Sequence, residues 1–239
     1  MKPAVLVLTG AGVSADSGLA TFRGAGGLWE GRSVEDVATP EAWAAHPESV
    51  WRFYQERRAK LGQVAPNPAH AALAAFERRL ARAGATFLLV TQNVDDLHER
   101  AGSERLLHMH GELAVLRCEQ CGHRGRDLEH VDPAAFVPCG ACAAQRLRPD
   151  VVWFGEVPYH LEAIDRALRA ATHVLAVGTS GVVYPAAGLL EAARVLGART
   201  VVQSLDEPAN LHPHDEFVAG RAAEALPLLL ERLARELAI

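Results

Sequence analysis

The sequence lacks any apolar run of membrane-spanning length and any excess of positive charge. A membrane helix needs about 20 apolar residues, whereas only five lie between Pro3 and Thr9, too few for a secretory signal. A net charge of −5 argues against nucleic acid as the main partner. We therefore expect a cytoplasmic protein with no membrane and no direct nucleic-acid partner. The sequence leaves the oligomeric state open and is compatible with a monomer.

Cysteine is also scarce, with four residues in the whole chain. They form two C-x-x-C pairs, Cys118/Cys121 and Cys139/Cys142, separated by 17 residues. In a reducing compartment this spacing favours a metal over disulfides. Four thiolates close a tetrahedral site with no open position for water, which predicts one structural Zn²⁺ per chain. The alternatives are redox-active pairs or free buried thiols, and His123 can replace one ligand.

The chain has enough apolar residues, 49% of the total, for a sizeable core. Runs typical of buried strands occur at 4–9, 85–91, 151–155, 173–177 and 200–204. Helical spacing occurs between or after them, at 47–61, 68–82, 158–171, 185–196 and 222–237. This alternation predicts an α/β fold with a parallel sheet. Two segments break the alternation, roughly 25–66 and 113–148, and together they predict a second, smaller domain.

The first strand pattern runs directly into Gly10-Ala11-Gly12. Glycines there permit a sharp turn and let a phosphate approach without a Cβ in the way. Residues 14–17 are expected to open a helix whose free N–H groups face an anion. The dinucleotide fingerprint is matched only with its permitted final alanine, so a plain strand-to-helix turn is the alternative. Residues 22–29 follow as a glycine-rich loop that can close over a ligand.

Polar residues also follow the next strand pattern. Asn93 and Asp95 come just after residues 85–91, and ligands of open α/β sheets bind at such carboxyl ends. A mere turn cap is the alternative for this pair. His110 precedes a glycine at the end of a short apolar stretch, where an imidazole can act as a base. His108 lies on the same face if that strand is regular, and residue chemistry alone does not separate the two histidines.

Several motifs together resemble the sirtuins, a family of NAD-dependent protein deacylases. In chain order they are Gly-Ala-Gly-Val-Ser-Ala-Asp-Ser-Gly at 10–18, Phe-Arg-Gly at 22–24, Thr-Gln-Asn-Val-Asp at 91–95, His110-Gly111, the two cysteine pairs, Phe154-Gly-Glu156 and Gly178-Thr-Ser180. The resemblance covers nearly the whole chain. Tyr54 and Arg57 are similar to the Tyr-x-x-Arg pair of the class III branch.

The resemblance implies a Rossmann-type NAD-binding domain formed by 1–24, 67–112 and 149–239. The smaller inserted domain would combine a helical module, 25–66, with a zinc-ribbon module, 113–148. NAD and an acyl-lysine protein substrate would meet between the two domains. The reaction would release nicotinamide and free lysine and would yield O-acyl-ADP-ribose.

The resemblance also implies site residues. His110 would be the general base, and Asn93 the second catalytic residue. The residues binding the co-substrate would be Gly10, Ala11, Gly12, Ser14, Phe22, Arg23, Trp29, Gln92, Asn93, Asp95, Gly178, Thr179, Ser180, Gln203, Ser204 and Ala222. The acyl-lysine would contact Tyr54, Arg57, Val152, Phe154 and Gly155. The sequence departs from the family where an asparagine usually serves the adenosine ribose, and Gln203 or Ser204 would take that place.

The acyl preference depends on Tyr54 and Arg57, which are three residues apart on a predicted helix and so share one face. A guanidinium binds a carboxylate bidentately, and a tyrosine hydroxyl adds one hydrogen bond. Ala38 is small enough to leave room beside them, and Arg58 is expected to face elsewhere. This predicts a preference for succinyl, malonyl or glutaryl groups, with acetyl secondary. From spacing alone, the alternative is a packed tyrosine covered by the arginine stem.

Other functions remain open at this point. An NAD-dependent deacetylase of ordinary preference or an ADP-ribosyltransferase would share the same fold. A hydride-transferring dehydrogenase is a more distant alternative. A zinc-ribbon binding module is the non-enzymatic one, but it would leave His110, Asn93 and Asp95 without a role.

Overall fold

The computed structural model describes residues 2–20, 28–29 and 32–239. Its centre is a six-stranded sheet in which all pairings are parallel, with the order β11-β10-β9-β1-β4-β5. The strands are β1 (Ala4–Thr9), β4 (Thr86–Thr91), β5 (Leu106–His108), β9 (His173–Val177), β10 (Arg199–Ser204) and β11 (Glu216–Ala219). The predicted α/β fold with a parallel sheet is therefore confirmed.

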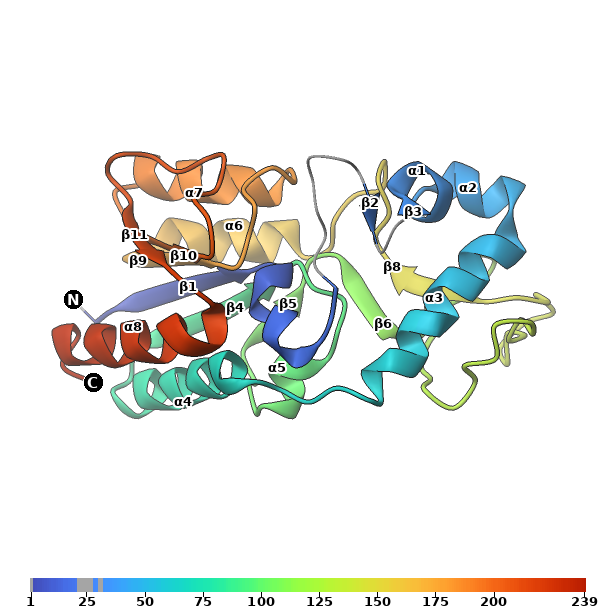
Figure 1. Ribbon diagram of the computed structural model, residues 1–239, viewed down its shortest axis with the longest axis horizontal. Coiled ribbons are helices and arrows are strands. Elements are labelled where there is room, and N and C mark those ends of the chain that lie inside the picture. Colours follow the sequence, from blue (N-terminus) through green and yellow to red (C-terminus); the bar gives the residue numbers. More distant parts are fainter. Residues whose placement is uncertain (1, 21–27, 30–31) are drawn as a thin grey trace.

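Helices cover both faces of this sheet (Figure 1). On one face lie α4 (Pro68–Arg82) and α8 (Ala222–Glu236), and on the other lie α6 (Leu161–Ala170) and α7 (Ala186–Val195). Side chains alternate along a strand, so Val5 and Val7 pack toward α4 and α8 while Leu6 packs toward α6 and α7. No helix among the described residues has both the length and the apolarity of a membrane span.

The strand order reverses its direction at β1. From β1 the chain proceeds through β4 to β5 on one side, whereas β9, β10 and β11 extend the sheet on the other. Ligands of open α/β sheets bind at such a reversal, beyond the carboxyl ends of the strands. The turn after β1 and the turn after β9 therefore meet at the expected place for a ligand.

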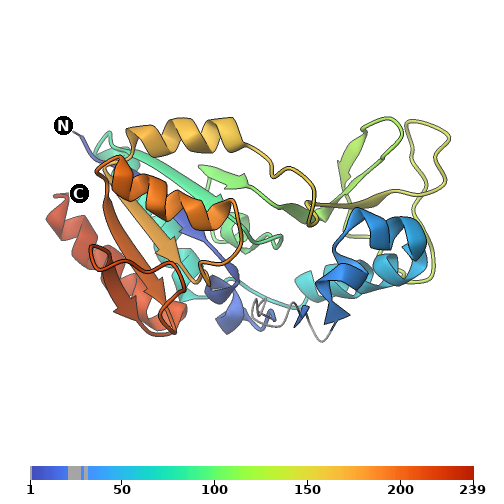
Figure 2. The ribbon, with the colours of Figure 1, turned by 90° about the horizontal axis from the view of Figure 1, so that it is seen from above.

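A smaller part of the molecule lies at one end of the sheet (Figures 1 and 2). It contains α1 (Val34–Val37), α2 (Pro40–Ala45), α3 (Pro47–Leu61) and the antiparallel strands β6 (Gly111–Arg117), β7 (Arg124–Arg126) and β8 (Arg148–Val151), with the short pair β2 (Leu28–Trp29) and β3 (Arg32–Ser33). The helices and strands share one core, which includes Trp43, Trp51, Tyr54 and Trp153. This shared core agrees with a second domain, whose residue boundaries stay a prediction.

Two predicted elements near the substrate segment were wrong in extent. The strand expected at 151–155 is β8, which ends at Val151, and the chain then turns through Gly155 with φ +88°. The helix expected from 158 begins only at Leu161, because His160 has φ +63°. A left-handed residue cannot belong to a right-handed helix.

The helix expected at residues 14–17 is instead a pair of short 3₁₀ turns, η1 (Ala11–Val13) and η2 (Ala15–Ser17). Gly18 ends the second turn with φ +91°, which any other residue would adopt only at a cost. Strand β11 and the short helix α5 (Leu97–Arg100) were not predicted. The glycine turn thus leads into a compact polar loop rather than a long helix.

Candidate active site

A cavity of 910 Å³ lies at the carboxyl edge of the parallel sheet and extends to the smaller part. Every predicted catalytic, co-substrate and acyl-lysine residue whose side chain the structure describes lines it: Gly10, Ala11, Gly12, Ser14, Tyr54, Arg57, Gln92, Asn93, Asp95, His110, Val152, Phe154, Gly155, Gly178, Thr179, Ser180, Gln203, Ser204 and Ala222. Phe22, Arg23 and the side chain of Trp29 lie outside the described residues. Residues from distant parts of the sequence therefore converge on one space.

The glycine turn after β1 packs directly against the turn after β9. The backbone N–H of Gly12 donates to the carbonyl oxygen of Gly178 at 2.8 Å. A Cβ on Gly10 would lie 2.8 Å from that same oxygen, and one on Gly12 would lie 2.8 Å from the Gly178 Cα. Real Cβ contacts are not this short, so both glycines are required by the close approach of the two turns.

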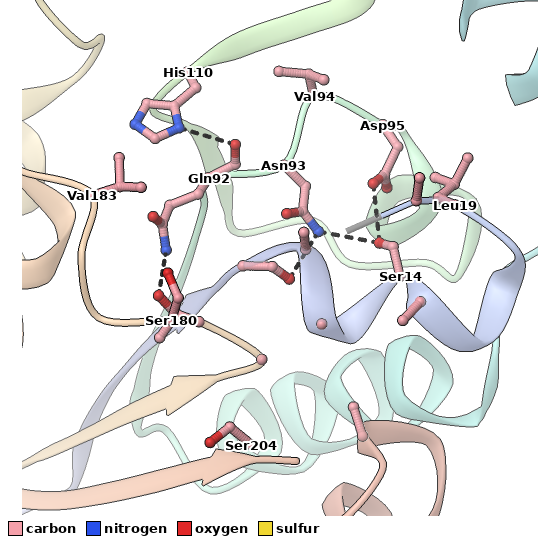
Figure 3. A pocket seen from close by; sticks show the side chains of 18 of the residues that line it. Ser14, Leu19, Gln92, Asn93, Val94, Asp95, His110, Ser180, Val183 and Ser204 are labelled. Carbon is pink, nitrogen blue, oxygen red and sulfur yellow. Dashed lines mark hydrogen bonds between the residues drawn. The ribbon is translucent and has the colours of Figure 1, made fainter. Parts of the chain in front are cut away.

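A buried chain of hydrogen bonds fixes Asn93 (Figure 3). Its side-chain N–H₂ donates to the carbonyl oxygen of Gly10 at 3.2 Å and to Ser14 Oγ at 3.1 Å. Ser14 Oγ in turn donates to Asp95 Oδ2 at 3.0 Å. Burial raises the pKa of Asp95, while hydrogen bonds from Leu97 N–H and Ser14 favour its charged form. The arrangement leaves the Asn93 amide with a single orientation.

Two buried histidines behind this chain were not identified from the sequence. His70 Nδ1 accepts from the backbone N–H of Asn67, so Nε2 carries the proton and lies 3.4 Å from Ser14 Oγ. The ring of His98 lies 4.8 Å from that of His70, and its Nε2 is 3.0 Å from Thr9 Oγ1. Burial lowers the pKa of His70 to about 4 and that of His98 well below its usual value. Both rings are therefore neutral near pH 7.

His110 and His108 have opposite surroundings. The His110 Nδ1–H donates to the carbonyl oxygen of Gln92 at 3.1 Å, which leaves Nε2 as the basic nitrogen, and burial lowers its pKa. His108 Nε2 lies 2.6 Å from Glu99 Oε1, outside the large cavity. Burial acts to lower the pKa of His108, but the hydrogen bond and the charge of Glu99 outweigh it and raise the pKa. Of these two histidines, only His110 is a neutral imidazole that lines the large cavity.

The predicted acyl-selecting pair lies on α3 at the other end of the cavity. Tyr54 is fully buried, and its hydroxyl oxygen accepts a hydrogen bond from Trp153 Nε1 at 2.8 Å. The Arg57 guanidinium lies 3.1 Å from the centre of the Phe53 ring and donates to the Phe53 carbonyl oxygen. Burial raises the pKa of Tyr54, so its hydroxyl keeps its proton. Arg58 faces away, as predicted, and donates to the carbonyl oxygen of Leu113 at 2.8 Å.

Trp153 is itself fixed by a buried ion pair that the sequence did not reveal. Arg148 donates to both carboxylate oxygens of Glu156, at 2.9 and 3.0 Å, and its guanidinium lies 3.2 Å from the Trp153 ring centre. Glu156 Oε2 also accepts from the backbone N–H of Trp153 at 2.9 Å. Burial acts to raise the pKa of Glu156, yet the hydrogen bonds and charge of Arg148 hold it below its usual value. Phe154 and Gly155, two of the predicted substrate residues, thus lie in a turn that this ion pair holds in place.

The two candidates for the adenosine ribose both line the cavity but differ in their own bonds. Gln203 donates its amide N–H₂ to the carbonyl oxygen of Gly220 at 2.7 Å. Its Oε1 is buried and has no hydrogen-bond partner among the described residues. Ser204 donates its hydroxyl to the carbonyl oxygen of Asp206. A buried acceptor without a partner is unfavourable, so Gln203 keeps a hydrogen-bonding atom still to be satisfied and stays the stronger candidate of the two.

The predicted zinc ligands come together in the smaller part. The Sγ atoms of Cys118, Cys121, Cys139 and Cys142 all lie within 4.8 Å of one another. The Cys118–Cys142 and Cys121–Cys139 sulfur pairs are 3.6 and 3.7 Å apart. Zinc–sulfur bonds of about 2.3 Å in a tetrahedron put sulfurs about 3.8 Å apart. The cluster is therefore consistent with a structural Zn²⁺, and these distances are too long for disulfides.

Comparison with known proteins places the chain in a family. The model of the "Sir2 family" matches residues 10–185. An NAD-dependent protein deacylase of Caulobacter vibrioides is 49% identical over 234 residues, covering 98% of each chain. The NAD-dependent protein deacylase of Escherichia coli K12 is 48% identical over 238 residues, covering 99% of this chain and 84% of that protein.

Solved structures agree with these sequence relatives. A mutant Sir2 homologue in complex with ADP-ribose superposes with a TM-score of 0.88 at 39% identity, covering 98% of this chain and 93% of the other. A Sir2 homologue in complex with NAD superposes with a TM-score of 0.86 at 38% identity, covering 98% and 90%. The resemblance to sirtuins is thus confirmed over almost the whole chain. The protein described here belongs to the Sir2 family.

Proposed function

We propose that this protein is an NAD-dependent protein-lysine deacylase that prefers acyl groups carrying a carboxylate. The observation that supports this function best is the single cavity with two unlike ends. Asn93 and His110 line it at the sheet, and Tyr54 and Arg57 line it at α3. The general deacylase activity agrees with the relatives of similar length, whereas the acyl preference depends on the α3 end alone.

The sheet end of the cavity has the properties required for NAD. The turn from Gly10 to Gly12 offers close backbone approach for a pyrophosphate, and Thr179 and Ser180 line the space opposite. Gln203 Oε1 offers a buried acceptor for a ribose hydroxyl. When bound, NAD supplies a ribose carbon that becomes electrophilic as nicotinamide departs. Asp95, which accepts from Ser14 Oγ, would accept from the nicotinamide carboxamide N–H₂.

His110 is the proposed general base. Its Nδ1–H is held by the Gln92 carbonyl oxygen, so Nε2 is available to accept a proton from a ribose hydroxyl of the bound nucleotide. Asn93, whose amide is fixed by Gly10 and Ser14, positions the reacting groups. The acyl group leaves lysine for the ribose oxygen, nicotinamide departs, and one water is consumed. The products are free lysine, nicotinamide and O-acyl-ADP-ribose.

The α3 end explains the proposed preference for charged acyl groups. The hydrogen bond from Trp153 Nε1 holds the Tyr54 hydroxyl at this end of the cavity, where it would contact the acyl group of a substrate. Arg57 adds a planar cation suited to a carboxylate, and Ala38 lines the same space with a small side chain. Val152 and Phe154 line the same cavity, where they would contact the acyl-lysine of a protein substrate. Succinyl, malonyl and glutaryl groups fit this chemistry, with acetyl as a secondary substrate.

Product analysis with NAD and a panel of acyl-lysine peptides tests this function. We expect nicotinamide and O-acyl-ADP-ribose in equal amounts, with succinyl-lysine consumed faster than acetyl-lysine. A preference for acetyl-lysine would leave the deacylase function intact and remove the proposed selectivity. Label transferred from NAD to a protein would instead indicate an ADP-ribosyltransferase, and formation of NADH a dehydrogenase.

A further inference from the structure

A second cavity, of 330 Å³, lies beside β5 and β6 and is separate from the large one. Its lining includes Glu99 of α5, His108 of β5, Glu112 of β6 and Ser103. None of these residues takes part in the function proposed above. The cavity is therefore a candidate for a separate binding site.

Three side chains there offer metal-ligand atoms to one point. One ligand atom each from Glu99, His108 and Glu112 lies within 4.8 Å of the other two. One imidazole nitrogen and two carboxylate oxygens suit a borderline divalent cation such as Zn²⁺. Together the two carboxylates carry a charge of −2, which such a cation neutralises. The nearby Arg124 does not oppose this, because it donates to Asp150 at 3.1 Å and lies 4.6 Å from the Tyr159 ring centre.

The hydrogen bonding of His108 prepares its Nε2 to be a ligand. His108 Nδ1 lies 3.0 Å from the backbone carbonyl oxygen of Asn93, which can only accept, so Nδ1 carries a proton. Metal-binding histidines usually donate their other N–H to a carbonyl or carboxylate in this way. Nε2 is 2.6 Å from Glu99 Oε1, and one proton lies between them. A cation entering here takes the place of that proton, which is released.

Ser103 provides an independent sign of an occupant. The residue is 6% exposed, it lines the same cavity, and its Oγ has no hydrogen-bond partner among the described residues. A buried hydroxyl without a partner is unfavourable. An occupant of this cavity that brings a hydrogen-bonding group to Ser103 would remove that cost.

We propose that Glu99, His108 and Glu112 bind a divalent cation of the Zn²⁺ type, at a second site distinct from the four-cysteine cluster. The hydrogen bond from His108 to the Asn93 carbonyl connects this cation to the segment that carries the Asn93 amide. The proposal concerns binding and does not depend on the deacylase function. Mg²⁺ is not expected to replace Zn²⁺, since it demands six oxygen ligands in an octahedron.

The test uses the full-length protein with its cysteine site already loaded. Protein shown by atomic emission to hold one zinc is freed of loose metal on a chelating resin and titrated with Zn²⁺ in a calorimeter. We expect one further equivalent to bind to the wild type. Disturbing partners of metal ligands alone costs about 10–100-fold in affinity, so His108→Gln and Glu112→Gln should each weaken this binding at least about tenfold. Glu104→Gln is the matched control, since Glu104 lines the cavity but lies outside the trio.

Several results would overturn the proposal. They are the absence of a second equivalent in the wild type, equal binding in Glu112→Gln and wild type, or an equal loss in Glu104→Gln. Melting temperatures without added Zn²⁺ identify any variant that fails to fold. Glu112→Gln keeps the shape of the side chain, so it tests the ligand charge even if His108→Gln is destabilised.

Discussion

Replacing Arg57 by methionine tests the acyl preference most directly. Methionine keeps an unbranched, flexible side chain that can still pack beside Phe53, but it removes the guanidinium. If Arg57 binds the distal carboxylate, the variant should lose activity only on acyl groups that carry one. A change of general fold or of NAD binding would affect all acyl groups alike.

The expected size of the effect follows from the surroundings of the guanidinium. Arg57 is only 5% exposed, so its bond to a carboxylate is shielded from water. A hydrogen bond to a charged partner is worth about 1.5–3 kcal/mol, and each 1.4 kcal/mol is roughly tenfold. Arg57→Met should therefore lower kcat/KM for a succinyl-lysine peptide about 10–100-fold. Acetyl-lysine has no distal carboxylate, so its kcat/KM should stay within about twofold on the same argument.

The assay compares kcat/KM for succinyl- and acetyl-lysine versions of one peptide, at saturating NAD, by following nicotinamide release. Lys60→Met is a matched control, because Lys60 is another cationic residue of α3 that lines the cavity. If positive charge acted only by general attraction, the two variants would lose equal kcat/KM for the succinyl-lysine peptide. If Arg57 contacts the carboxylate directly, Arg57→Met should lose much more than Lys60→Met. Equal loss on both peptides would refute the assignment of Arg57 to the acyl carboxylate.

Two further predictions concern the sheet end of the cavity. His110→Ala should bind NAD normally in calorimetry but lose deacylation activity by about 10²–10⁴-fold. His108→Ala should lose much less of this activity. A comparable loss of activity in both variants, with unchanged melting temperatures, would contradict the assignment of His110 as the one general base. Ser14→Ala removes one buried hydrogen-bond partner from each of Asn93 and Asp95, so unfolding in denaturant should show a loss of about 1–3 kcal/mol. It should also raise KM for NAD, and an unchanged KM would show that this chain of bonds does not position the nucleotide.

Much of the fold follows from local patterns in the sequence. Strands such as 173–177 and helices such as 47–61 were predicted with correct or nearly correct ends, because periodicity and capping residues are local signals. The prediction of a strand at 151–155 was wrong because the apolar residues after Val151 have other roles. Trp153 is 2% exposed in the core of the smaller part, and Phe154 lies at the cavity. Apolar residues indicate that a segment is buried, but they do not indicate which part of the protein it packs against.

The site residues also fall into two groups, those that local sequence patterns predict and those that they do not. The contiguous motifs around Gly10, Asn93 and His110 could be predicted, since each follows a strand whose end is visible in the sequence. The contact between Ser14 and His70 joins residues 56 positions apart, and that between Trp153 and Tyr54 joins residues 99 positions apart. No local pattern indicates such pairs. Only the position of His70 near the start of a capped helix hinted at a role.

A series of contacts connects the cysteine cluster to the α3 end of the cavity. Glu119 follows Cys118 directly, and its carboxylate lies 3.6 Å from the Arg148 guanidinium. Arg148 lies against the Trp153 ring, at 3.2 Å from its centre, and Trp153 donates to the Tyr54 hydroxyl oxygen. The sheet end also contacts the smaller part, through a 2.6 Å hydrogen bond from Arg126 to Asp96, but its glycine turns are held by the parallel sheet itself. The structural zinc should therefore matter more for the acyl group than for the nucleotide.

Removing zinc with a chelator tests this asymmetry. Loss of the metal should loosen the Cys118–Cys142 segment, because four thiolates without a cation no longer hold it together. We expect kcat/KM for succinyl-lysine to fall while the Kd for NAD changes much less, and we expect both to recover when Zn²⁺ is restored. Zinc content is followed by atomic emission, and Cys139→Ala serves as a variant that cannot be reloaded fully. If NAD affinity falls in parallel with acyl-lysine activity, the zinc supports the whole fold and the path through Arg148 carries no special weight.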